Sequence, residues 1–119
     1  MKNWLVPLAV ILPLAAAPIA MAASSRLGDM APFEAIASDT LVLIDKGEIK
    51  AAEKRITDFE TAWDKAESTL YSKDKTAWST IDDAADAAIS SLRASQPDAV
   101  EAQKTVSALI DMLKDPSAR

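Results

Sequence analysis

The sequence feature that most constrains the fold is an apolar stripe that follows helical spacing between residues 49 and 70. Its seven members succeed one another at intervals of three and four residues: Ile49, Ala52, Ile56, Phe59, Trp63, Ala66 and Leu70. Charged side chains occupy most of the positions between them, so a helix here has one apolar face and several polar ones. Such a narrow apolar face stabilises a helix only when it packs against other helices. The stripe therefore predicts a helical bundle.

Three further segments carry apolar residues at helical spacing. The first begins near Ala31 and stops at Gly47, the next begins after Asp74, and the last follows Pro97 and ends before Pro116. The last segment is expected to bury five residues: Val100, Val106, Leu109, Ile110 and Leu113. Short connections between helices favour antiparallel neighbours. We therefore predict an all-α fold, an antiparallel up-down-up-down four-helix bundle over residues 31–116, with residues 23–30 as a flexible lead.

The first 22 residues have the pattern of a signal peptide. Lys2 supplies a positive start, residues 4–21 are free of charge, and Ala20-Met21-Ala22 matches the small-x-small pattern that signal peptidase recognises. The alternative is an uncleaved membrane anchor, because an apolar run of this length is near the spanning threshold. Three prolines interrupt the run, which favours a cleaved leader. We predict export, with residues 1–22 removed and a periplasmic or secreted location.

The composition excludes several classes of function. The sequence contains neither histidine nor cysteine, which rules out a histidine-based catalytic triad, a catalytic thiolate and ordinary zinc, copper or haem ligation. Two glycines are too few for a glycine-rich phosphate loop. The net charge of −5 disfavours nucleic acid and anionic lipid as partners. We therefore predict a protein without a cofactor that is not an enzyme. A hydrolase built on two carboxylates across a cleft is the alternative.

Acidic residues form the first candidate site. Asp82, Asp83 and Asp86 fall within about one helical turn, and Asp64 and Glu67 form a second pair beside Trp63. Carboxylates at these spacings repel one another, and a cation or a basic partner relieves that repulsion. Oxygen ligands suit calcium, magnesium, manganese or iron, so these five residues are candidate metal ligands. The other interpretation is a solvated acidic face, because carboxylates are common on helix surfaces.

Aromatic residues form the second candidate site. Trp63 and Trp78 stand on the apolar faces of two successive helices, and Tyr71 lies near the turn that joins them. Core packing is one interpretation of the two tryptophans. The other is an aromatic surface for a ligand or protein partner, which would include Trp63, Tyr71 and Trp78, with Lys73 and Lys75 as its polar rim.

A resemblance to known proteins rests on a run of residues across this helical hairpin: Gly47, Ala51-Ala52, Phe59, Trp63-Asp64, Glu67, Trp78, Ile81-Asp82-Asp83 and Leu92. The run resembles the helical periplasmic segment of bacterial iron permeases of the FTR1 type. It is equally similar to small exported helical-bundle proteins of proteobacteria with no assigned role. The permeases also carry membrane helices with an Arg-Glu-x-x-Glu motif, and this sequence has neither after its leader. The resemblance implies an accessory that meets iron or a permease outside the cytoplasmic membrane.

Together these observations predict an exported, non-enzymatic helical-bundle protein that binds a partner, most simply another protein of the periplasm. Two alternatives stay open. One is an accessory to iron uptake that uses the surface carboxylates, with a divalent metal such as iron as its ligand. The other is a sensory-type ligand-binding bundle. The oligomeric state is also open, because Val42 and Leu43 widen the apolar face of the first helix.

Overall fold

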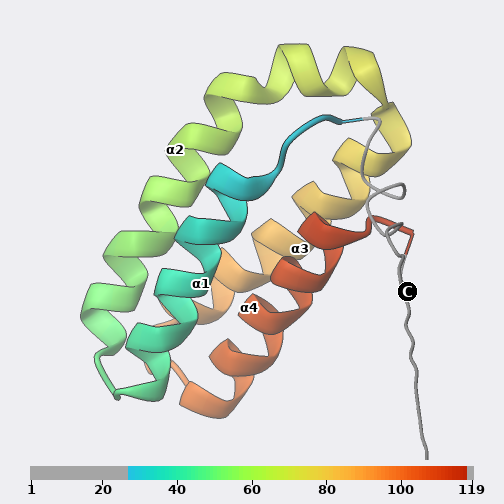
Figure 1. The fold of residues 1–119 in the computed structure, drawn as a ribbon. Helices are drawn as coiled ribbons and strands as arrows, with labels where there is room; N and C mark the ends of the chain where they lie inside the picture. Colours follow the sequence, from blue (N-terminus) through green and yellow to red (C-terminus); the bar gives the residue numbers. More distant parts are fainter. Residues whose placement is uncertain (1–26, 118–119) are drawn as a thin grey trace, which may run out of the picture.

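Four α-helices account for nearly all of residues 27–117, the part of the chain that the computed structural model describes (Figure 1). They are α1 (Ala31–Asp45), α2 (Ile49–Lys73), α3 (Lys75–Arg93) and α4 (Ala99–Lys114). These described residues contain no strand, so the prediction of an all-α fold with four helices is confirmed. The predicted signal peptide, residues 1–22, lies outside the described part of the chain.

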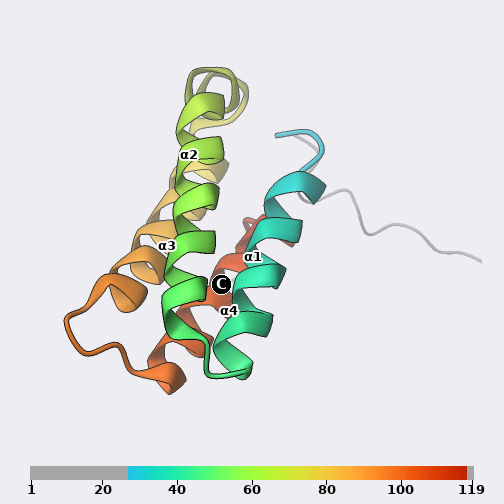
Figure 2. The same ribbon diagram turned by 90° about the vertical axis from the view of Figure 1, so that its left-hand side faces the viewer.

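Each helix packs against two others, which makes a four-sided bundle. α1 contacts α2 and α4, and α3 contacts the same two helices from the other side (Figures 1 and 2). The predicted stripe of α2 faces this core: its buried members are Ala52, Ile56, Phe59, Trp63 and Leu70, while Ile49 and Ala66 are partly buried. Helical spacing places these residues on one side of α2, and that side is the one its neighbours cover.

α4 contributes its apolar face with one exception. Ala102, Val106, Leu109 and Leu113 are buried at intervals of four, three and four residues. Val100 was expected in the core and is instead 71% exposed, so that prediction is wrong. Val100 stands in the first turn of α4, two residues before the first buried position, Ala102, and points away from the buried stripe.

Side chains and one glycine define where the helices begin and end. Gly47 has φ +79° in the α1–α2 turn, a left-handed conformation that glycine adopts without steric cost. The Asp74 carboxylate accepts a hydrogen bond of 3.0 Å from the N–H of Ala77, and it thereby caps α3. The Asp98 carboxylate accepts a bond of 2.9 Å from the N–H of Val100 and caps α4. These caps give α3 and α4 a defined start.

α2 is the longest helix, with 25 residues against 15 in α1. At 1.5 Å per residue it is about 37 Å long, so it extends beyond the start of α1. Figure 1 shows its last turns arching over one end of the bundle before the chain enters α3. No helix of the described residues is both long enough and apolar enough to cross a bilayer.

Candidate functional site

The two candidate sites meet where α2 packs against α3. Trp63 belongs to the apolar stripe of α2, and its indole Nε1–H donates a hydrogen bond of 3.1 Å to Oδ1 of Asp82 on α3. Asp82 directly follows the buried Ile81, so it lies at the edge of the helix face that packs on the core. This bond joins the aromatic residues to the acidic residues, two groups that the sequence suggested separately.

The aromatic residues form a continuous cluster from the core to the surface. Trp63 is buried and its ring stacks parallel to that of Trp78, with centroids 6.2 Å apart. Phe33 of α1 packs edge-on against Trp63 at 5.2 Å, and Phe59 lies beside both rings. At the outer end, Tyr71 packs edge-on against Trp78 at 5.5 Å. The exposed fraction of Tyr71 is 41%, so this end of the cluster is open to solvent.

Phe33 is the member of this cluster that the sequence did not single out. Its spacing placed it on the apolar face of α1, but helical periodicity does not say which residue of another helix it touches. The buried indoles also differ in their hydrogen bonding. Trp78 Nε1 is buried and has no hydrogen-bond acceptor among the described residues, whereas Trp63 Nε1 has Asp82.

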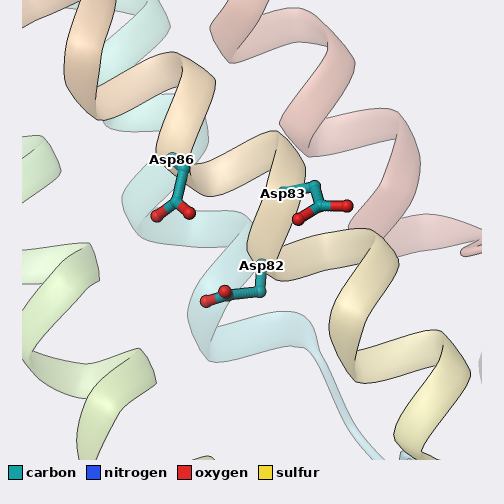
Figure 3. Close-up of side chains that lie close together, drawn as sticks. All are labelled: Asp82, Asp83 and Asp86. Atoms are coloured by element: carbon teal, nitrogen blue, oxygen red, sulfur yellow. The ribbon is translucent and has the colours of Figure 1, made fainter.

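The three aspartates of α3 form a compact acidic group. Each carboxylate of Asp82, Asp83 and Asp86 offers one oxygen atom, and these atoms lie within 4.8 Å of one another. Figure 3 shows the three side chains leaving neighbouring positions of the same helix. Asp82 is partly buried, while the other two are exposed. The sequence-predicted ligands of α3 are therefore close together, as their spacing of one helical turn requires.

The environment of Asp82 raises the pKa of its carboxyl group. The largest cause is burial, which disfavours the charged form, and the next is repulsion from Asp86. The hydrogen bond from Trp63 acts in the opposite direction, because it stabilises the carboxylate. Asp83 and Glu67 add further repulsion. The ionised form of Asp82 therefore lowers the stability of the folded state.

The other two candidate ligands lie on α2. Asp64 and Glu67 are exposed and line a shallow, open hollow of about 280 Å³ together with Ser68 and Tyr71. Glu67 is near enough to Asp82 to raise the pKa of that carboxyl group. In the described residues, however, neither Asp64 nor Glu67 joins the compact group on α3. The five predicted ligands therefore occupy two neighbouring positions on the α2–α3 face.

No basic side chain neutralises these carboxylates within residues 27–117. The ion pairs of this part of the chain join Arg55 to Asp39 and Asp58, and Arg93 to Glu60. Lys75, one of the two predicted rim lysines, has its Nζ 5.9 Å from the centre of the Tyr71 ring, which is a cation–π geometry. We call the surface formed by Asp64, Glu67, Ser68, Tyr71, Asp82, Asp83 and Asp86 the acidic face.

The acidic face offers carboxylate oxygens as its chemical groups. Carboxylate oxygens suit hard cations such as calcium, magnesium, manganese or iron. The compact group, however, draws all its ligands from one turn of one helix, whereas a tight site needs ligands that converge from several elements. Comparison with known proteins adds no assignment: no family model, no curated protein and no solved structure matches this chain.

The bond between Trp63 and Asp82 predicts a measurable coupling. In a double-mutant cycle with Trp63→Phe and Asp82→Ala, the coupling free energy should be about 1 kcal/mol, the net value of one hydrogen bond. Urea unfolding of the four proteins measures it. Trp78→Phe removes an indole N–H that has no acceptor among the described residues, so it should destabilise the bundle less than Trp63→Phe. Zero coupling, or a larger cost at Trp78, would contradict this account.

The raised pKa of Asp82 predicts how stability depends on pH. The folded protein binds more protons than the unfolded chain between the unfolded value of about 3.9 and the higher folded value, so the free energy of unfolding falls as pH rises through that interval. Asp82→Asn keeps an acceptor oxygen for Trp63 and removes the charge. It should stabilise the protein at pH 7 by a few tenths of a kcal/mol, comparable to relief of one like-charge pair.

The same substitution should have almost no effect below about pH 3, where the wild-type carboxyl group is already protonated in both states. Urea unfolding at pH 3, 5 and 7 measures the difference. Asp111→Asn on the exposed side of α4 is the matched control, because it removes a carboxylate that lies outside the acidic face. If Asp82→Asn raised the free energy of unfolding as much at pH 3 as at pH 7, the charge of Asp82 would not be the cause of the stabilisation.

Proposed function

We propose that this protein is exported to the periplasm or secreted, and that it acts as a non-enzymatic binding module. In this proposal the leader, residues 1–22, is removed, and the helices form an antiparallel up-down-up-down bundle. The short connections support that topology, since three residues join α1 to α2, one joins α2 to α3 and five join α3 to α4. The absence of cysteine and histidine from the whole sequence supports a module that binds without covalent or acid–base chemistry by those side chains.

The observation that carries the proposal is the acidic face. It combines a partly exposed aromatic ring, Tyr71, with a shallow hollow and carboxylates that no described lysine or arginine pairs with. Tyrosine is enriched at protein interfaces because its ring supplies contact area at a low entropic cost. Uncompensated negative charge complements a partner that presents lysine or arginine, and it speeds the encounter. We therefore propose that the partner is a protein with a basic surface segment.

Site-specific photocrosslinking tests this function. A photoreactive phenylalanine analogue in place of Tyr71 should capture a distinct partner in the periplasm of a Gram-negative host, and the same analogue at Val100 should not. Val100 is the matched control because it is more exposed and lies on α4. Adding Asp64→Asn and Glu67→Gln to the Tyr71 variant should abolish the product, since both carboxylates line the hollow.

Two outcomes would oppose the proposal. One is recovery of the full-length chain, with its leader intact, from the cytosol alone. The other is crosslinking from Val100 as strong as from Tyr71, because binding would then not be directed to the acidic face.

A second function, as an accessory in iron uptake, draws support from the compact group on α3. Its three carboxylates are close enough to share one cation. Ferrous iron or manganese at millimolar concentration should then raise the melting temperature by a few degrees, because a ligand that binds only the folded state stabilises it. The double variant Asp82→Asn with Asp86→Asn should lose the shift, and Asp111→Asn should keep it. If neither ferrous iron nor manganese changes the melting temperature, this function is eliminated.

A further inference from the structure

Residues 27–30 form a short non-helical segment that lies against the bundle before α1 begins. Two of its four residues are buried, with exposed fractions of 1% for Leu27 and 4% for Met30. Gly28 and Asp29 between them are exposed. Leu27 and Met30 belong to the same buried cluster as Phe59, Trp63 and Leu70. We call residues 27–30 the strap.

Among the described residues, the strap is held against α2, α3 and α4 by side-chain packing alone. Its hydrogen bonds are local: Oδ1 of Asp29 accepts from the N–H of Ala31 at 2.9 Å, and the carbonyl of Met30 accepts from the N–H of Glu34 at 2.9 Å. Among the described residues, no hydrogen bond or ion pair joins the strap to α2, α3 or α4. Lifting the strap therefore breaks no hydrogen bond to those helices.

The position of the strap places it at the edge of the aromatic cluster. Met30 precedes Phe33 by three residues, and Phe33 packs against both Phe59 and Trp63. A β-carbon at Gly28 would lie 3.6 Å from Nζ of Lys73, so the strap passes the last residue of α2. Figure 1 shows the strap running from α1 toward the end of the bundle where α2 meets α3.

We propose that the strap opens and closes independently of the four helices, and that its opening exposes part of the buried cluster to which Leu27 and Met30 belong. Burial of two side chains favours the closed form, while the ordering of four residues opposes it, so the two contributions are of similar size. The buried side chains of the four helices are covered on several sides, so a local opening does not expose them. The proposal concerns the strap alone and holds whether or not the acidic face binds a basic partner.

Gly28 determines the path of the strap. Its φ of +91° lies in the region that residues with a β-carbon rarely adopt. Alanine at this position would strain the closed form, and its β-carbon would meet the helices only at Nζ of Lys73, at an ordinary contact distance of 3.6 Å. Gly28→Ala should therefore shift the strap toward its open form and leave the stability of the bundle nearly unchanged.

Cysteine labelling of the full chain tests the proposal, because the sequence contains no cysteine of its own. A single thiol is introduced at Met30→Cys to report on the strap, and at Val106→Cys, a fully buried position of α4, to report on the bundle. Under native conditions the Met30→Cys thiol should react with a disulfide reagent at least about a hundredfold faster, since only local opening is required. Low concentrations of urea should accelerate the Val106→Cys thiol alone.

Gly28→Ala should accelerate the Met30→Cys thiol about tenfold and leave the Val106→Cys thiol unchanged. Leu27→Cys is a second reporter for the case in which Met30→Cys folds poorly by circular dichroism. Equal reaction rates for the strap and bundle thiols, with the same dependence on urea, would overturn the proposal. So would an effect of Gly28→Ala that is equal at both positions.

Discussion

Burial of the α2 stripe is the interaction on which the rest of this structure depends. α2 touches both α1 and α3, and its Phe59 and Trp63 are the largest fully buried side chains of the described residues. Burying large aromatic side chains is worth several times a surface ion pair. Two ion pairs lie beside the stripe, Arg55 of α2 with Asp39 of α1 and Arg93 of α3 with Glu60 of α2. They lie at the surface and add little energy.

Trp63 also explains why the core and the acidic face belong to one site. An indole packs as an apolar ring but carries an N–H that needs an acceptor when it is buried. Asp82 supplies that acceptor from the edge of α3, and the bond draws a carboxylate into a partly buried position beside other acids. The hydrogen bond that satisfies the buried indole N–H therefore also concentrates negative charge on the surface. Tyr71, which continues the aromatic cluster outward, places an exposed ring next to that charge.

The sequence anticipated the parts of this arrangement that arise within one helix. The buried stripe of α2 and the closeness of Asp82 to Asp86 both follow from 3.6 residues per turn, and both are present. Val100 shows the limit of helical periodicity, because an apolar residue in the first turn of a helix has no neighbour to cover it unless another element reaches it. The Trp63–Asp82 bond spans two helices, and spacing along the chain carries no information about rotation of one helix relative to another. Leu27 and Met30 likewise became core residues through a segment without helical periodicity.

By itself, then, the sequence determined that the chain is helical, which face of each helix is apolar and where caps such as Asp74 and Asp98 end or start a helix. These properties depend on interactions over a few residues, and local physics decides them. The tertiary structure alone decided that α1 and α3 each lie between α2 and α4, that Phe33 meets Trp63, and that Asp82 rather than Asp83 receives the indole N–H. Those outcomes depend on how four faces fit together at once, because the rotation and offset of each helix adjust until the largest side chains are buried.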